Sequence, residues 1–180
     1  MAQIEKMSLL EECEQLPDET RNKPKAAAVL SDEEIQKLYT DNILGATTPK
    51  SLLNTIWLNN SLHFGLRGTH EQYNLRWGDV KLKTDASGNE FLEFNERQTQ
   101  TRTGANASDA RKIHPKMFAS PELGNRDPIY IYKQYSDKRP PGFSTDDSPF
   151  YLATRTVPLT DIFDQWFLRQ KLGEKKLPRC

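Results

Sequence analysis

Residues 66–80, with the sequence LRGTHEQYNLRWGDV, carry the side chains whose types and spacing could do chemistry. Arg67 precedes a predicted helix start, Glu71 follows about one turn later, and the stretch ends in a Leu-x-Trp-x-Asp pattern. A guanidinium beside the unpaired N–H groups of a helix N-terminus is suited to binding a phosphate. The same spacing also fits an Arg67–Glu71 ion pair that fixes the turn, and the spacing alone does not decide between these interpretations.

Two predicted helices position Arg67. The first begins at Thr48-Pro49, because proline is tolerated in the first turn, and it ends at Gly65. Its expected core face comprises Leu52, Leu53, Ile56, Trp57, Asn60 and His63. The second helix begins with the capping-box pattern of residues 69–72 and continues through Leu75 and Arg76. Arg67 is therefore expected in the turn between two helices.

The remaining patterns predict a mixed α+β fold, mostly helical with a small antiparallel sheet. Capping signals begin further helices at Ser31 and at Asp127, and the second of these ends at residues 140–142. The predicted extended segments are residues 80–83 and 90–94, which form a hairpin, residues 97–102, which can pair with 111–114, and residues 149–152. The predicted core aromatic residues are Trp57, Trp77, Phe91, Phe94, Tyr132 and Tyr135.

Charge is balanced over the chain but unevenly distributed. The 180 residues carry 25 basic and 25 acidic side chains, which excludes a polybasic coat for nucleic acid or membrane. Residues 1–34 carry a net charge of −5, residues 35–96 of −1 and residues 97–180 of +6. Prolines and charges near the start predict a disordered tail over residues 1–29 and a folded domain over residues 30–180.

Several functional classes lack their motifs in this sequence. It contains no glycine-rich phosphate loop, HExxH, GxSxG or DxDxDG pattern, so hydrolase, nucleotide and calcium sites are not expected. Cys13 and Cys180 have no metal-ligand spacing, which argues against a metal site and a disulfide framework and fits a reducing compartment. No apolar run approaches the roughly 18 residues of a membrane span, and the acidic start is unlike a signal peptide.

Five segments in order carry a family resemblance. They are SLLNT at residues 51–55, LRG at 66–68, TQTRTG at 99–104, SPFYL at 148–152, and WF at 166–167 leading to LG at 172–173. Together they resemble Crypton-type tyrosine recombinases, in the domesticated form that makes up the carboxy-terminal domain of zinc finger MYM-type proteins and glutamine-rich protein 1. The resemblance covers about residues 30–177 and implies a fold like the amino-terminal half of a tyrosine-recombinase catalytic domain.

The resemblance also implies roles for individual residues. In active members, two arginines neutralise one DNA phosphate, a hairpin lysine protonates the leaving oxygen, and a tyrosine attacks the phosphorus. Arg67 matches the first arginine, Glu71 its acidic companion, and Gln100 replaces the lysine with a group that cannot act as an acid. The sequence has no His-x-x-Arg motif, and the nucleophile is expected beyond Cys180. These three positions are therefore vestigial, and no functional catalytic residue and no enzymatic activity are expected.

The residues and the resemblance together predict a non-catalytic, transposon-derived DNA-binding domain of a nuclear chromatin or transcription protein. The residues expected to contact duplex DNA are Arg67, Arg97, Arg102, Arg111 and Lys112. Proteins of chromatin or transcription are further candidate partners, while no cofactor, metal or membrane is expected. Two alternatives stay open: a protein-interaction module that kept only the fold, and a fragment of an active strand-exchange recombinase.

Overall fold

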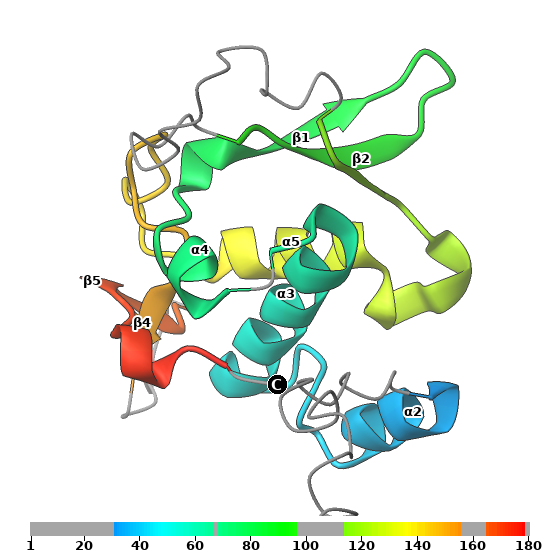
Figure 1. Ribbon diagram of the computed structural model, residues 1–180, viewed down its shortest axis with the longest axis horizontal. Helices are drawn as coiled ribbons and strands as arrows, with labels where there is room; N and C mark the ends of the chain where they lie inside the picture. Colours follow the sequence, from blue (N-terminus) through cyan, green and yellow to red (C-terminus); the bar gives the residue numbers. More distant parts are fainter. Residues whose placement is uncertain (1–30, 67, 97–113, 156–164, 179–180) are drawn as a thin grey trace, which may run out of the picture. The chain divides into compact units, whose positions relative to one another are not determined.

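The computed structural model describes residues 31–66, 68–96, 114–155 and 165–178 (Figure 1). The predicted disordered tail, residues 1–29, lies outside these ranges. The helices are α2 (Asp32–Thr40), α3 (Pro49–Phe64), α4 (Thr69–Tyr73) and α5 (Pro128–Asp137), with short 3₁₀ turns η2 (Trp77–Asp79), η3 (Pro121–Arg126) and η4 (Glu174–Lys176). The strands are β1 (Val80–Thr84), β2 (Glu90–Phe94), β3 (Lys116–Phe118), β4 (Leu152–Thr154) and β5 (Phe167–Lys171). The predicted α+β class is confirmed.

Helix α3 begins and ends where the sequence predicts. The Thr48 hydroxyl oxygen accepts a hydrogen bond from the Ser51 N–H at 3.1 Å, and the Ser51 hydroxyl oxygen accepts one from the Thr48 N–H at 3.0 Å. At the other end Gly65 has a φ of 70°, a left-handed conformation that glycine adopts without strain. The expected core face is buried except for His63, which is exposed because the last turn directs Phe64 into the core instead.

The predicted hairpin forms as strands β1 and β2, which pair antiparallel from Val80↔Phe94 to Thr84↔Glu90. The Asp85 carboxylate holds the turn between them by accepting from the N–H groups of Ser87 and Asn89 at 2.8 and 2.9 Å. Strand β3 then pairs with β2, with Glu93 opposite Lys116. This third strand was not predicted, because three residues are too few to show the alternation that marks a strand.

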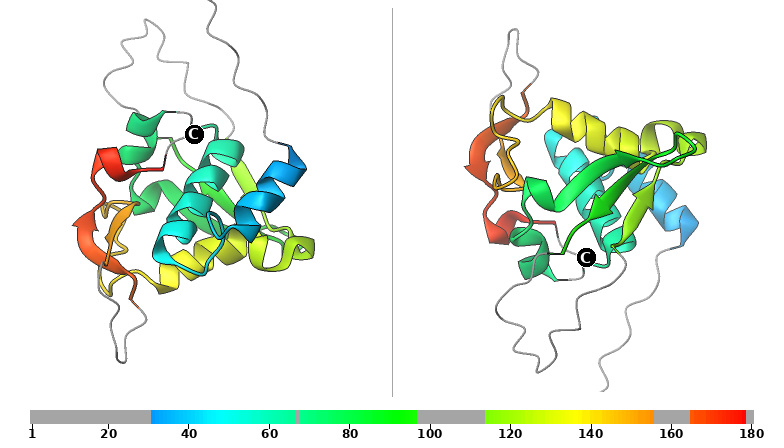
Figure 2. Two further views of the ribbon diagram at one scale, coloured as in Figure 1. Left: turned by 90° about the horizontal axis from the view of Figure 1, so that it is seen from below. Right: turned by 90° about the horizontal axis from the view of Figure 1, so that it is seen from above.

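Helices α3 and α5 cover one face of the three-stranded sheet, and the views in Figures 1 and 2 agree on this arrangement. Strand alternation directs Val80, Leu92, Phe94 and Met117 from the sheet into the core beneath these helices. Helix α5 is capped by Asp127, whose carboxylate accepts from the Ile129 N–H at 3.1 Å. All six aromatic residues predicted for the core are buried.

A second, two-stranded sheet joins β4 to β5. The sequence places a strand at residues 149–152, whereas strand β4 begins at Leu152 and Pro149 instead forms an isolated bridge with Arg76. Proline has no N–H to donate, which favours its place at the edge of the pairing. Phe167 of β5 and the following Leu172 and Leu177 are buried in the core.

Candidate nucleic-acid interface

The turn between α3 and α4 is the part of the molecule to which the sequence assigns phosphate chemistry. The structure confirms that two helices flank it, while Arg67 itself lies outside the described residues. Helix α4 is shorter than predicted, ending at Tyr73, and its cap is Gly68 rather than Thr69. The cap shifts by one residue because the Glu71 carboxylate accepts from the Gly68 N–H at 3.3 Å. Glu71 therefore holds the backbone next to residue 67.

An aromatic pair joins the end of α3 to the end of β2. The rings of Phe64 and Phe94 stack with centroids 5.5 Å apart, and both residues are buried. Phe64 comes three residues before Arg67 in the sequence, and Phe94 comes three residues before Arg97. This pair therefore brings together the two points from which the chain leads into the sequence-predicted site residues.

The other predicted DNA-contacting residues, Arg97, Arg102, Arg111 and Lys112, and the vestigial Gln100 belong to residues 97–113, outside the described ranges. The structure describes the chain on either side of this segment. The Phe94 N–H donates to the Pro115 carbonyl at 3.0 Å, and the β2–β3 pairing follows directly. Residues 97–113 carry four basic side chains and one acidic side chain, a net charge of +3. The chain before this segment and the chain after it are hydrogen-bonded to each other.

The face of the sheet opposite the helices carries a group of lysines that the sequence interpretation missed. Lys81, Lys83 and Lys116 alternate onto this face and surround Glu93. The pKa of the Glu93 carboxyl is lowered, first by its hydrogen bond from Lys83 and then by the positive charges of Lys83, Lys116 and His114. The alternation of lysine with apolar residues in VKLK was the signal that could have indicated this face.

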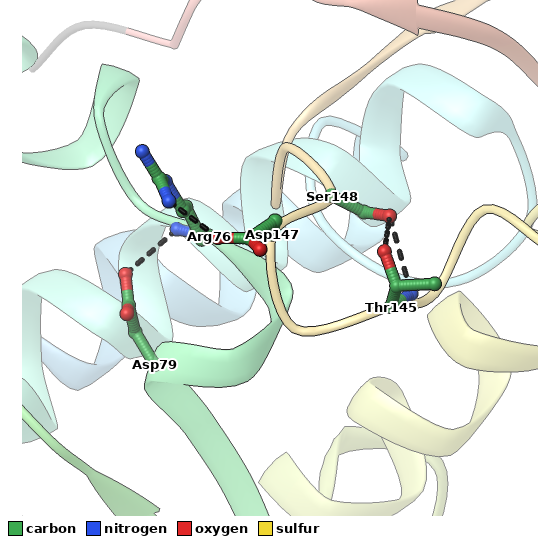
Figure 3. A network of polar contacts seen from close by, with 5 residues as sticks. All are labelled: Arg76, Asp79, Thr145, Asp147 and Ser148. Atoms are coloured by element: carbon green, nitrogen blue, oxygen red, sulfur yellow. Dashed lines mark hydrogen bonds and ion pairs between the residues drawn. The ribbon is translucent and has the colours of Figure 1, made fainter.

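The Leu-x-Trp-x-Asp pattern that ends the predicted phosphate motif has a structural role (Figure 3). The Asp79 carboxylate accepts from the backbone N–H of Arg76 at 2.8 Å, and the Arg76 guanidinium forms an ion pair with Asp147. The backbone N–H of Trp77 donates to the Ser148 carbonyl at 2.8 Å. The pattern therefore attaches η2 to the loop before β4, and its arginine is already paired with an acid.

Two tyrosines of α5 and the tyrosine directly before β4 lie in the core. Tyr132, Tyr135 and Tyr151 are buried, and burial raises the pKa of Tyr132 and of Tyr135 to about 12 and that of Tyr151 well above its ordinary value. An activated nucleophile requires the opposite shift, because the deprotonated oxygen is the one that attacks. Tyr130 is the exposed member of this helix, with 40% of its surface accessible.

The described part of the chain shows neither a metal site nor a membrane-spanning helix. Within residues 31–66, 68–96, 114–155 and 165–178, no group of three or more histidine, cysteine, aspartate or glutamate side chains is arranged to hold a metal ion. Among the helices in these ranges, none has the length and apolar character needed to cross a membrane.

Comparison with known proteins gives a family and two distant relatives. Residues 29–180 match the family model described as "Domain of unknown function (DUF3504)". The uncharacterized protein KIAA1958 of Homo sapiens and its Mus musculus homolog are each 29% identical to the chain over 150 residues. The match covers 82% of this chain and 20% of each relative, so the chain spans about a fifth of the length of the curated relatives it matches. No solved structure matches the chain.

Proposed function

This chain belongs to the DUF3504 family, and we propose that it is a non-catalytic domain that binds duplex DNA. We trace the domain to a Crypton-type tyrosine recombinase, because five segments resembling those proteins follow one another in order along the chain. The proposed setting is the nucleus, together with proteins of chromatin or transcription.

The observation that carries the proposal is the stacking of Phe64 on Phe94. Arg67 and Arg97 each follow one member of this pair by three residues, and three residues span at most about 11 Å of extended chain. Chain connectivity therefore keeps each arginine within about 11 Å of one member of this aromatic pair. Residues 97–113, whose net charge is +3, connect strand β2 to strand β3, and the described chain on either side of them is joined by the bond from the Phe94 N–H to the Pro115 carbonyl. Basic side chains that contact DNA neutralise its phosphates and release the counterions that surround it.

Two observations support binding without catalysis. Gln100 occupies the place where the resemblance requires a proton-donating lysine, and a carboxamide cannot supply a proton to the leaving oxygen. The buried Tyr132, Tyr135 and Tyr151 hold their protons more tightly than a free tyrosine does. They are therefore poor candidates for a nucleophile that must reach a DNA phosphate.

The experiment measures binding of the full 180-residue chain to a short fluorescein-labelled DNA duplex by fluorescence anisotropy. Arg67→Ala should weaken binding by about 1–3 kcal/mol, or roughly 5- to 150-fold, because a charge-assisted phosphate contact is lost. Arg126→Ala is the matched control, since it removes one positive charge from η3, where the arginine contacts Gln36 and the Tyr39 ring. The control should bind as the wild type does.

Salt separates DNA binding from the protein-interaction alternative. Phosphate contacts make the affinity fall steeply as salt rises, whereas an apolar interaction surface gives little salt dependence. Equal affinities of wild type and Arg67→Ala at low salt, with both proteins folded, would contradict the proposal. A covalent protein–DNA product on a denaturing gel, formed from a nicked substrate, would contradict its non-catalytic part.

A further inference from the structure

Residue 67 is bracketed by hydrogen bonds that come from two neighbouring residues of α4. On one side, the Leu66 carbonyl accepts from the side-chain amide of Gln72 at 3.2 Å. On the other side, the Gly68 carbonyl accepts from the Gln72 backbone N–H at 3.2 Å, and the Gly68 N–H donates to the Glu71 carboxylate at 3.3 Å. The backbone is thus held directly before and directly after Arg67.

Gln72 also anchors this turn to α3. Its side chain is fully buried, and its Nε2 lies 3.2 Å from the Trp57 carbonyl oxygen and 2.8 Å from the Ser61 hydroxyl oxygen. Carbonyl oxygens can only accept, so the NH₂ group must face Trp57 and Leu66, and the amide oxygen must face the other way. The orientation of the Gln72 amide is therefore fixed by its surroundings.

Tyr151, far along the chain in the segment that leads into β4, meets that amide oxygen. The Tyr151 hydroxyl donates to Gln72 Oε1 and accepts from the Asn60 side-chain amide at 2.9 Å. Burial raises the pKa of the Tyr151 phenol well above its ordinary value, so the hydroxyl keeps the proton that it donates. Hydrogen bonds thus run in one direction from α3 through Tyr151 to Gln72, and from Gln72 to the turn.

If residue 72 served packing alone, a leucine would be less costly to bury than a glutamine, because a buried amide must regain the hydrogen bonds that it loses to water. We infer that Gln72, held by Tyr151, is the positioning residue for the turn that presents Arg67. The inference rests on the proposed function for its consequence in DNA binding. Gln72 does not touch DNA in this proposal and acts through the backbone on either side of Arg67.

The first experiment follows the turn itself. Gln72→Met keeps the volume of the side chain and removes its polar bonds, and hydrogen exchange of the Gly68 amide, measured by NMR, reports whether the turn opens. We expect exchange at Gly68 to rise about tenfold or more relative to Ile131→Val, a buried control on α5 whose apolar side chain makes none of the hydrogen bonds that hold the turn. Tyr151→Phe should act in the same direction. Unchanged protection of Gly68 in Gln72→Met would overturn the inference.

The second experiment is a double-mutant cycle on duplex affinity at fixed salt, with folding of every variant checked by circular dichroism. Gln72→Met should weaken binding about tenfold when Arg67 is present and less than about twofold in the Arg67→Ala background. Equal losses in both backgrounds, or no loss in either, would overturn the inference. If Arg67→Ala binds as the wild type does, the proposed function fails, and the exchange at Gly68 then decides whether Gln72 holds the turn.

Discussion

Arg139 brings a guanidinium into the core of the protein, where its hydrogen bonds all go to neutral oxygens. Its five N–H donors are matched by five acceptors at 2.6–3.2 Å: the Ser144 and Tyr135 hydroxyls and the carbonyls of Phe143, Pro149 and Phe150. The guanidinium also lies 4.1 Å from the centre of the Trp77 ring. Arg139 therefore holds Phe143, Ser144, Pro149 and Phe150 of the loop between α5 and β4. No sequence pattern predicted this, because the acceptors are carbonyls that any residue could supply.

Arg139→Lys should destabilise the fold by about 2–4 kcal/mol. A lysine has three donors on a flexible stem and cannot reproduce the planar fork, so buried carbonyls lose their partners. Urea denaturation followed by tryptophan fluorescence measures the loss. Arg169→Lys is the matched control, because Arg169 is exposed and donates to the Pro141 carbonyl alone among the bonds described; its change should stay within about 0.5 kcal/mol. Equal denaturation midpoints for the two variants would contradict this account.

At the scale of elements, helix starts and the hairpin could be predicted, while short pairings could not. Thr48 and Asp127 cap their helices through hydrogen bonds within three residues, so the signal is local and visible in the sequence. Strand β3 forms by pairing with the edge of β2. The start of α4 is shifted by one residue because the Glu71 carboxylate accepts a hydrogen bond from the Gly68 N–H. These outcomes depend on neighbours in space, which periodicity does not record.

Gly78→Ala should push η2 away from the loop that precedes β4, because the two backbones are in close contact at Gly78 and Asp146. A Cβ at Gly78 would lie 2.7–2.8 Å from the Cβ, Cα and carbonyl oxygen of Asp146, so the backbone of that loop would have to move. We expect a loss of about 1–3 kcal/mol in the free energy of unfolding, measured in urea. Gly173→Ala is the control, because nothing lies within 4 Å of its added Cβ and its φ is −64°. If Gly78→Ala lowered the free energy of unfolding no more than Gly173→Ala, the loop around Asp146 would be able to move without cost, and this account would be wrong.

At the scale of the whole molecule, three buried tyrosines link stability to high pH. Tyr132 and Tyr135 have pKa values of about 12 in the fold, and Tyr151 is also raised, against an ordinary value of 10 in the unfolded chain. Between about pH 10 and pH 12, the phenols therefore keep their protons in the folded state and lose them in the unfolded state. The stability contributed by these phenols is complete below about pH 10 and is lost as the pH rises towards 12.

We expect alkaline unfolding between about pH 10 and pH 12, in which tyrosinate absorbance and the loss of far-ultraviolet circular dichroism appear together. Tyr135→Phe should weaken the pH dependence, because one of the linked phenols is gone. Tyr130→Phe is the control, since Tyr130 is exposed, and it should leave the midpoint unchanged. Ionisation of all six tyrosines near pH 10 with the circular dichroism intact would disprove the linkage.

The candidate site was predictable in its residue types and less so in its assembly. The arginine of the LRG segment and the basic stretch that follows β2 are visible as charges in the sequence. The contact of Phe64 with Phe94 joins residues 30 positions apart, and that of Gln72 with Tyr151 joins residues 79 apart. Pairings at such separations depend on the folded arrangement of α3, the sheet and β4, and one sequence read by local pattern does not contain them.

The bond from the Phe94 N–H to the Pro115 carbonyl joins the chain on the two sides of residues 97–113. Because this bond and the β2–β3 pairing hold the two sides together, the connecting chain can vary in length at little cost, and doubling its length would cost only about 0.6 kcal/mol in chain entropy. Insertions, deletions and charge changes there can accumulate while the rest of the domain stays the same. Residues 97–113 are therefore a place where a designed sequence of another length or charge can be grafted onto the described fold.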